Sequence, residues 1–573
     1  MMRYLLLSVL LLASLGAAAT EARLSLTASD GTGLTLTRLQ ARVVLEGFLA
    51  FTELELVFHN PENRRREGRF QMVLPEGAAI SRFAMEVAGY LQEGEVVETG
   101  LARRAYEDFL HRRQDPALLE TDSGNRFNAR IFPIEANEHK RLILSYSQRL
   151  TGGDYVLPLA GLPRLEELGI RVYHDVADGE TRQVGGLTAT TRRREVLNVS
   201  ERHYLPQEDF RMPRDLSPGL TLRSDELLAS LLVPITDAAP ASLDDLLLLV
   251  DTSASQAPHL STTLARLETL LDTLAPGSVR VLAFDQGVVD LGEAHGPAGW
   301  QALLARLGER PALGASRLEA ALAHLAGLAR TPARVLLVSD MVLSAGETGA
   351  AALTEQLAAI DGLQRLDILL PGYHQDRALA EALARAGDSA GLVAALDDDI
   401  DTLARDLTRD LATDLLVTVA SADWHWPETI PALRAGEPVL VFARLPAGTA
   451  PRIQVAGEPQ DLHVQASEPL LLHREAVRGR LDKLLAMEDA STDADLKRAL
   501  HREIIDLSVR ERVLSPYTSL LVLETEADYA RYGIDRRGLA AILTVGADGL
   551  ETIQREGRQG RQPPVIAAPL PVP

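Results

Sequence analysis

The chain of 573 residues, with 46% hydrophobic and 24% charged residues, has the composition of a soluble globular protein of several domains. Its 58 Lys and Arg residues stand against 80 Asp and Glu residues, and the formal net charge of -22 repels a phosphate backbone, so we expect no nucleic acid partner. The chain has no cysteine, which excludes disulfides, thiolate metal sites and attachment of a lipid through cysteine.

The first residues have the pattern of an export signal. Arg3 precedes an apolar run over residues 5–15, and Ala17-Ala18-Ala19 offers a cleavage site between small residues. The run is too short to span a bilayer comfortably, and no later segment reaches 18 uninterrupted apolar residues. We therefore expect residues 1–22 to be a signal peptide, and the mature protein to be periplasmic, secreted or at the cell surface without a membrane span.

Alternating apolar and polar residues begin at Leu34. Leu39, Ala41, Val43 and Leu45 share one face while Gln40, Arg42 and Glu46 point the other way, as in antiparallel strands that have one solvent-exposed face. A predicted helix over 102–112 interrupts these strands, and short strands continue from 151 to 235. The pattern predicts a β-sandwich.

Two stretches after this helix carry a family resemblance. They are Asp115-Pro116-Ala117-Leu118-Leu119-Glu120 and Gly124-Asn125-Arg126-Phe127-Asn128-Ala129-Arg130-Ile131-Phe132-Pro133-Ile134. They resemble the VIT domain, which precedes a von Willebrand factor A (vWA) domain in inter-α-trypsin inhibitor heavy chains. The resemblance implies a VIT β-sandwich over residues 23–150. Turn and capping chemistry explains Asp115 and Asn125 better than a catalytic role does.

The apolar run from Leu246 to Val250 stops at an acid and two hydroxyls. An unbroken apolar run indicates a parallel strand that is buried on both faces by helices. Ligands bind where such strands end. Asp251, Ser253 and Ser255 then lie in the loop at the carboxyl end of the strand, with the oxygen ligands that Mg²⁺ or Mn²⁺ prefers.

The D-x-S-x-S pattern resembles the metal-ion-dependent adhesion site of vWA domains. That family takes a Thr from a second loop and an Asp from the end of a later strand. Ser316 stands at the first of these positions and keeps the hydroxyl, but it lacks the β-methyl that stiffens χ1. Asp340 stands at the second, although Met341 follows where the family commonly has Gly. The resemblance implies Mg²⁺, or Mn²⁺ or Ca²⁺, bound by Asp251, Ser253, Ser255, Ser316 and Asp340.

Alternating strands and helices over residues 243–412 predict a complete, doubly wound vWA domain. Two other motifs in it lack their structural context. Ser389 lies in a G-x-S-x-G pattern, but a predicted helix precedes it and a predicted strand follows, the reverse of a nucleophile elbow. Residues 397–401 resemble the start of an EF-hand loop, but Thr402 takes the Gly position, and an acidic helix N-terminus explains them better.

The strand pattern returns over residues 413–475. Because isolated pairs of strands are marginal in water, we expect these strands to pool with those of 151–235 in one β-sandwich that hosts the vWA domain, resembling the hybrid domain of integrin β chains. The two ends of the vWA domain should then lie close together. Residues 476–545 predict a helical and strand region, and the Gly-, Gln-, Arg- and Pro-rich residues 546–573 predict a disordered tail.

The fold class is therefore a multidomain α/β plus all-β protein, which we expect to bind a protein partner. The vWA resemblance implies that an acidic side chain of the partner completes the coordination of the cation. Two alternatives are a structural or assembly scaffold with a vestigial metal site, and a metal-dependent hydrolase. We expect no enzyme, because the sequence shows neither a His-rich metal cluster nor a Ser/His/Asp arrangement in context. The sequence leaves the oligomeric state open.

Overall fold

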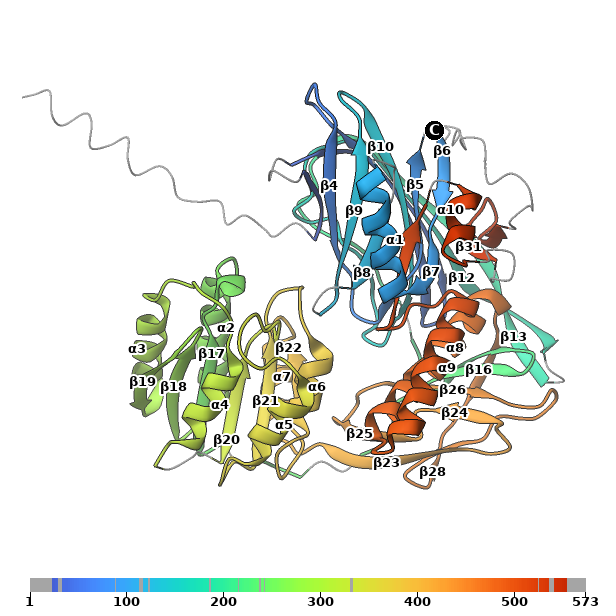
Figure 1. Ribbon diagram of the computed structural model, residues 1–573. Helices are drawn as coiled ribbons and strands as arrows, with labels where there is room; N and C mark the ends of the chain where they lie inside the picture. Colours follow the sequence, from blue (N-terminus) through green and yellow to red (C-terminus); the bar gives the residue numbers. More distant parts are fainter. Residues whose placement is uncertain are drawn as a thin grey trace, which may run out of the picture.

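The computed structural model consists of a large β-rich body and a smaller α/β domain beside it (Figure 1). The structure describes residues 23–28, 33–87, 89–112, 117–121, 124–184, 187–214, 216–236, 239–241, 243–329, 333–523, 525–534 and 541–553. The expected signal peptide at 1–22 and the part of the expected tail from 554 to 573 lie outside these residues. We call residues 243–407 the α/β domain and the described residues on either side of it the β-body.

Two sheets form the frame of the β-body. The larger is a 12-stranded sheet, in the order β24 (Trp424–Trp426), β26 (Val439–Arg444), β16 (Leu227–Leu232), β15 (Leu220–Ser224), β29 (His463–Ala466), β13 (Leu187–Tyr204), β12 (Leu165–Val184), β2 (Thr35–Glu46), β3 (Leu49–His59), β10 (His139–Arg149), β5 (Ala78–Val87) and β6 (Tyr90–Glu93). The smaller is a 6-stranded sheet, in the order β1 (Leu24–Ala28), β4 (Arg66–Val73), β9 (Arg126–Ile134), β8 (Ala117–Thr121), β30 (Thr518–Val522) and β7 (Glu95–Glu98).

The two sheets enclose a shared apolar core. Phe70 on β4 of the small sheet contacts Phe58 on β3, with ring centroids 6.2 Å apart, and Phe83 on β5, with centroids 6.5 Å apart. All three rings are buried. This is the β-sandwich that the alternating pattern after Leu34 predicts, because alternation places one row of side chains between the sheets.

The expected boundary at residue 150 does not separate two sandwiches. Strand β12 pairs in parallel with β2, with Ile170 opposite Ala41, so residues after 150 extend the same large sheet. The pairing covers an edge of β2 that would otherwise expose unpaired backbone groups. The sequence does not predict this pairing, because alternation within a strand does not indicate which strand lies beside it.

The C-terminal region is also part of the β-body rather than a separate unit. Strand β30 lies between β7 and β8 and pairs with both. Two helices, α1 (Thr99–Arg112) and α10 (Glu526–Arg531), cover the outer face of the small sheet, where Tyr106 and Tyr529 join one apolar cluster. The small sheet therefore needs both ends of the chain to be complete.

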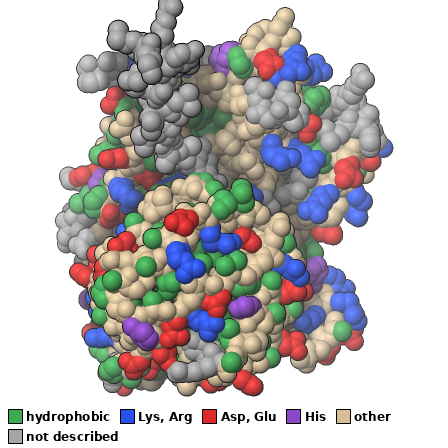
Figure 2. Space-filling view, turned by 90° about the vertical axis from the view of Figure 1, so that its left-hand side faces the viewer, with side chains coloured by type: hydrophobic (Ala, Val, Ile, Leu, Met, Phe, Trp, Pro, Cys, Tyr) green, Lys and Arg blue, Asp and Glu red, His purple; other side chains and the backbone are tan. Residues whose placement is uncertain are grey.

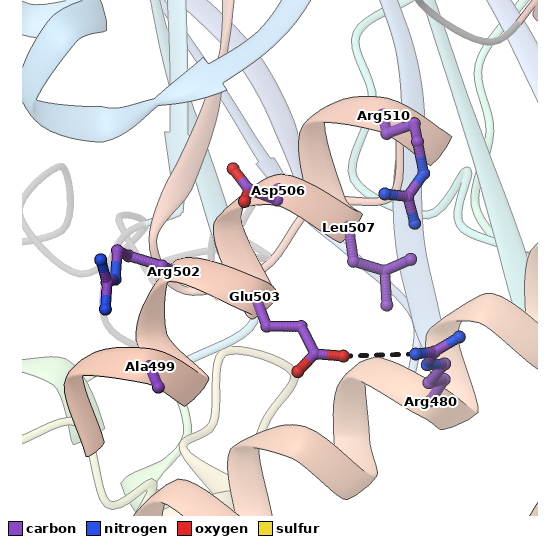
Figure 3. Close-up of a pocket in the computed structure, with 7 residues that line it drawn as sticks. All are labelled: Arg480, Ala499, Arg502, Glu503, Asp506, Leu507 and Arg510. Atoms are coloured by element: carbon purple, nitrogen blue, oxygen red, sulfur yellow. Dashed lines mark hydrogen bonds and ion pairs between the residues drawn. The ribbon is translucent and has the colours of Figure 1, made fainter. Parts of the chain in front are cut away.

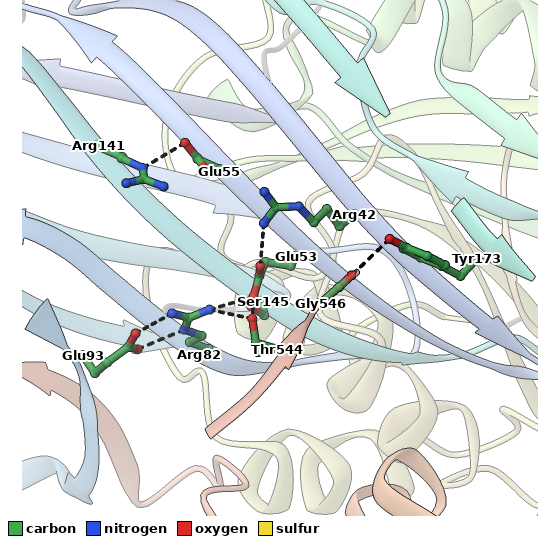
Figure 4. Close-up of polar contacts among 10 residues, drawn as sticks. All are labelled: Arg42, Glu53, Glu55, Arg82, Glu93, Arg141, Ser145, Tyr173, Thr544 and Gly546. Atoms are coloured by element: carbon green, nitrogen blue, oxygen red, sulfur yellow. Dashed lines mark hydrogen bonds and ion pairs between the residues drawn. The ribbon is translucent and has the colours of Figure 1, made fainter. Parts of the chain in front are cut away.

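A buried polar network holds a further C-terminal hairpin, β31 (Ile542–Val545) and β32 (Leu550–Ile553), against the large sheet (Figure 4). The Glu53 carboxylate accepts hydrogen bonds from Arg82 at 2.8 Å and from Thr544 at 2.7 Å. The hydroxyl of Tyr173 lies 3.0 Å from the carbonyl oxygen of Gly546. The expected disordered tail therefore begins too early, because residues 546–553 are held in this hairpin.

The remaining elements of the β-body pack on the large sheet. Helix α8 (Pro469–Ala490) packs through Leu471 against Phe51 and Phe442, and α9 (Ala494–Glu511) packs beside α8. A four-stranded sheet covers the end of the large sheet formed by β16 and β26. It contains β25 (Thr429–Leu433), β23 (Ala412–Val419), β27 (Ile453–Val455) and β28 (Glu458–Pro459). Strands β11 (Tyr155–Leu157) and β14 (Phe210–Met212) form a separate pair.

The α/β domain has a six-stranded sheet between two layers of helices (Figure 1). Its order is β19 (Val288–Ala294), β18 (Ser278–Phe284), β17 (Asp245–Asp251), β20 (Arg334–Val338), β21 (Arg365–Leu370) and β22 (Val393–Ala395), and only β19 runs antiparallel to its neighbour. Leu248 and Val250 pack with α2 (Leu260–Leu274), α3 (Gly296–Gly308) and α7 (Ile400–Leu407). Leu247 and Leu249 pack with α4 (Leu318–Ala326), α5 (Ala350–Ala358) and α6 (Arg377–Ala384). Both faces of β17 are buried, which explains its unbroken apolar run.

The α/β domain is inserted into the β-body. Strand β16 before it pairs with β26 after it, and β15 pairs with β29, so strands from both sides share the large sheet. The entering and leaving segments lie side by side, with Ala241 N–H donating to Thr408 O at 2.9 Å and Asp410 N–H donating to Ala239 O at 2.8 Å. Within the described residues, no helix is both long and apolar enough to span a membrane.

Glu46 on β2 makes the stability of the β-body depend on pH. Burial is the main cause that raises the pKa of Glu46 to about 7, and the negative charge of Asp175 also raises it. Hydrogen bonds from Glu468 N–H and Ser467 lower the pKa and offset part of this increase. The stability that the protonated carboxyl contributes is fully present below its unfolded pKa of about 4.5 and is lost as pH rises through 7.

We predict that Glu46→Gln removes this loss, which amounts to roughly 3 kcal/mol for a shift of this size. The free energy of unfolding in urea, measured at pH 5 and pH 8, should fall less with pH in the variant than in the native protein. Glu166→Gln, at an exposed position on β12, is the matched control and should leave the pH dependence unchanged. Equal pH dependence in Glu46→Gln and the native protein would contradict the prediction.

Candidate metal-binding site

The predicted ligands lie at the carboxyl edge of the α/β sheet. Strand β17 ends at Asp251, and Ser253 and Ser255 follow in the loop that contains the short 3₁₀ turn η1 (Ala254–Gln256). Strand β20 ends at Val338, next to β17, so Asp340 follows at the same edge. Ser316 lies in the loop before α4. Parallel neighbours end at the same edge, which brings the loops after β17 and β20 together. Backbone bonds from Ala254 N–H to Gly314 O at 2.9 Å and from Leu313 N–H to Thr252 O at 3.1 Å hold the loop of Ser316 beside them.

The Asp251 carboxylate is the centre of the hydrogen bonds in the site. Its Oδ1 accepts a hydrogen bond from Ser253 N–H at 2.8 Å. Its Oδ2 accepts from the hydroxyls of Ser316 and Ser339, each at 2.8 Å. Asp251 thereby contacts all three loops, and its side chain is 1% exposed.

A second set of contacts connects Asp340 to the first loop. Ser253 Oγ lies 3.2 Å from Ser255 Oγ. The side-chain amide of Gln256 donates to Ser255 Oγ at 3.1 Å and to Asp340 Oδ2 at 2.7 Å, and Val342 N–H donates to Asp340 Oδ1 at 2.9 Å. The structure therefore brings together all five residues that the sequence pattern selects.

Two residues of the site, Ser339 and Gln256, are absent from the sequence prediction. Ser339 orients Asp251, and Gln256 bridges Ser255 and Asp340. Both are buried. Each is adjacent in sequence to a predicted ligand, which is the one signal in the sequence that points to them, but their bonds to the carboxylates follow only from the side-chain directions.

The electrostatics of the site favour a bound cation. Burial, together with the negative charge of Asp251 and opposed by the hydrogen bonds that Asp340 accepts, raises the pKa of Asp340 to about 6. The hydrogen-bond donors to the two carboxylates are hydroxyl, side-chain amide and backbone N–H groups, which are neutral. A divalent ion would offset the charges of both acids.

The donor set fits a hard divalent ion. Carboxylate and hydroxyl oxygens are the ligands that Mg²⁺, Mn²⁺ and Ca²⁺ prefer. Across the described residues, no group of three or more His, Cys, Asp or Glu side chains is placed to hold a metal, which agrees with a site in which hydroxyls outnumber acids. Asp251, Ser253, Ser255, Ser316 and Asp340 would hold the ion, and the ion would supply a Lewis-acidic position for an incoming oxygen ligand.

Both departures from the vWA pattern have visible structural consequences. Met341 adopts φ +61°, in the left-handed region that favours Gly, and its side chain is fully buried. This conformation costs roughly 1 to 2 kcal/mol in an L residue, and packing of the Met side chain offsets it. Ser316, in place of Thr, is 1% exposed and is oriented by its hydrogen bond to Asp251.

The G-x-S-x-G pattern at Ser389 and the acidic residues 397–401 have structural roles. Ser389 Oγ lies 3.3 Å from Gln364 O, in the turn between α6 and β22. Asp399 caps α7 by accepting from Thr402 N–H at 3.0 Å, as expected for an acidic helix N-terminus.

A separate surface hollow lies between α8 and α9, and charged side chains line most of it (Figure 3). Arg480 pairs there with Glu503 at 3.2 Å, and about half of each side chain is exposed. The other lining residues are Ala499, Arg502, Asp506, Leu507 and Arg510, all on α9.

Comparisons with known families identify both domains. The family model described as vault protein inter-alpha-trypsin domain (VIT) matches residues 36–146, and the model described as VWA domain containing CoxE-like protein matches residues 218–399. No curated protein sequence matches the chain significantly. The chain therefore contains a VIT domain in the β-body and a vWA-type domain, the α/β domain described above.

Solved structures to which the chain is similar are distant in sequence. A von Willebrand factor type A protein from Catenulispora acidiphila is 13% identical, with a TM-score of 0.28, and the match covers 57% of this chain and 88% of that one. BatB from Bacteroides thetaiotaomicron is 13% identical, with a TM-score of 0.24, over 28% of this chain and 95% of that one. Proximal thread matrix protein 1 from the mussel byssus, whose MIDAS motif holds zinc, is 11% identical, with a TM-score of 0.24, over 31% of this chain and 47% of that one.

Ser316 and Ser339 make the same hydrogen bond to Asp251, but only Ser316 is a predicted metal ligand, whereas Ser339 only orients Asp251. Comparing their Ala variants therefore distinguishes loss of a ligand from loss of an orienting contact. Each serine donates to Asp251 Oδ2 at 2.8 Å, so each Ala substitution should cost a similar free energy of unfolding, roughly 1.5 to 3 kcal/mol. We predict that Ser316→Ala weakens Mn²⁺ binding at least tenfold by isothermal titration, and that Ser339→Ala has a clearly smaller effect. Equal losses of Mn²⁺ affinity would contradict these two roles.

Proposed function

We propose that this VIT and vWA protein is an exported binding protein whose vWA domain holds a protein partner through a divalent cation. One observation carries the proposal: two buried carboxylates, Asp251 and Asp340, lie among hydroxyls, and within the described part of the chain every hydrogen-bond donor to them is neutral. Such a site is costly unless a cation or a proton neutralises it. Arg3 and the apolar run over 5–15 support the export part of the proposal.

The choice of ligands suits an ion that binds a further oxygen. Neutral hydroxyls donate less charge than carboxylates, so an ion held by Ser253, Ser255 and Ser316 stays electrophilic. Ser255 is exposed, whereas the other four predicted ligands are buried, so solvent reaches the site from the side of Ser255. An acidic side chain of the partner would enter there and complete the coordination.

The surroundings of the site suit a protein partner. Leu313, which is 62% exposed, and Tyr373, which is 42% exposed, lie in loops at the same edge of the sheet as the site. Exposed apolar side chains beside polar groups are typical of protein interaction surfaces. Figure 2 shows the vWA end of the molecule, where acidic and basic side chains are interspersed, without the single-sign basic field that nucleic acid would need.

Metal titration tests the site without knowledge of the partner. We predict that Mn²⁺ and Mg²⁺ bind the native protein with one site per chain, and that Asp251→Ala abolishes the binding, because Asp251 is both a ligand and the contact between the three loops. Ser389→Ala is the control and should bind as the native protein does. Absence of binding to the native protein would favour the alternative, a scaffold with a vestigial site.

Capture from the envelope fraction of the source cell tests the cation bridge. The native protein should retain a partner in Mg²⁺ and release it in EDTA, and Ser253→Ala should retain much less, because one hydroxyl of the donor set is lost. Retention that is the same in Mg²⁺, in EDTA and with Ser253→Ala would show that the partner does not bind through the cation.

A further inference from the structure

The VIT domain contacts the vWA domain at the edge that carries the metal site. The contact is made by the turn before β9, which contains Gly124 and Asn125, and by the loop 371–376 after β21. Gly124 has φ +70°, and a Cβ there would lie 2.5 Å from Gln375 O. The approach of the two backbones therefore requires Gly at this position.

Asn125 connects the two domains with its backbone and its side chain. Its N–H donates to Gln375 O at 3.2 Å, and its Oδ1 accepts from Gln375 N–H at 3.1 Å. Its Nδ2 donates to Tyr373 O at 2.9 Å and to Leu74 O of the VIT domain at 2.8 Å. The last bond fixes the side chain on its own domain, so Asn125 holds loop 371–376 from a rigid base.

The same loop contacts the metal site. Asp376 N–H donates to the backbone carbonyl of Asp340 at 2.9 Å, and the Asp376 side chain caps α6 by accepting from Leu379 N–H at 3.0 Å. Gln375, which Asn125 binds, is the residue before Asp376. A continuous path of hydrogen bonds and one peptide link therefore runs from Asn125 to Asp340.

Other contacts across the joint are weaker or less directed. The Arg377 guanidinium pairs with Glu76 at 3.1 Å, but the Glu76 side chain is 69% exposed, and exposed ion pairs contribute little. The Arg23 guanidinium lies 3.1 Å from the centroid of the Tyr373 ring. Asn125 alone of these residues binds the backbone of the loop on both sides of residue 374.

We infer that Asn125 is a positioning residue of the metal site, which acts across the domain joint by holding the loop that supports Asp340. The inference rests on the proposed function, because it needs a cation at the vWA site. Coupling between two sites is reciprocal, so bound cation must stabilise the joint by the same factor by which the joint strengthens cation binding. The metal site and the VIT domain thus act as one unit.

Two variants of the full chain test the inference by Mn²⁺ titration. Asn125→Ala removes the side-chain bonds to the loop and to Leu74, and we predict that it weakens Mn²⁺ binding about fivefold or more. Asn125→Asp keeps the acceptor for Gln375 N–H and loses the Nδ2 donors, so its affinity should lie between those of Asn125→Ala and the native protein. Asn128→Ala is the matched control, because Asn128 lies on β9 and accepts from Gln71 within the VIT domain.

Hydrogen exchange supplies a second readout that a merely structural role would not change. The backbone amides of Asn125 and Gln375 both donate across the joint, so Mn²⁺ should slow their exchange in the native protein by the factor that Asn125→Ala loses in affinity. If Asn125→Ala binds Mn²⁺ as tightly as the native protein, or if Mn²⁺ does not change the exchange rates of these amides, the coupling is overturned while the proposed function stands. Absence of Mn²⁺ binding to the native protein would overturn both.

Discussion

The Asp251 carboxylate is the interaction on which the vWA site depends. It is buried and binds the amide of its own loop, a hydroxyl before α4 and a hydroxyl after β20. A buried charge needs such partners, so the three loops are held at fixed positions whether or not their other residues contact a ligand. Burial, and after it the negative charge of Asp251, raises the pKa of Asp340, and a cation or a proton at the site would offset that cost.

The sequence predicts the vWA domain well and the β-body less well, for a physical reason. Helices of the same domain cover both faces of strand β17, so its unbroken apolar run is enough to predict that it is a buried strand. The position of β30 between β7 and β8 depends on partners hundreds of residues away, and the sequence of residues 518–522 does not indicate which strands those partners are. Periodicity indicates which face of a strand is buried but not what pairs with its edges.

The site residues divide in the same way. Asp251, Ser253, Ser255, Ser316 and Asp340 follow from strand ends and a family pattern, and the structure places them together. Ser339 and Gln256 needed coordinates, because only the side-chain directions show that one donates to Asp251 and the other to Asp340. The sequence around Asn125 predicts a turn residue. Its bonds to Tyr373 and Gln375 show that the same polar side chain also serves the domain joint.

The insertion places two kinds of connection at opposite ends of the vWA sheet. The covalent connection, where Ala241 meets Thr408, lies at the end at which the strands begin, since Arg334 at the start of β20 donates to Leu407 O there. The contact through Asn125 lies at the end at which the strands stop, beside Asp340. A rearrangement of the metal loops reaches the second connection through a single loop, whereas it reaches the first only through the packed length of the sheet. The non-covalent contact is therefore the place where the VIT domain and the metal site can influence each other.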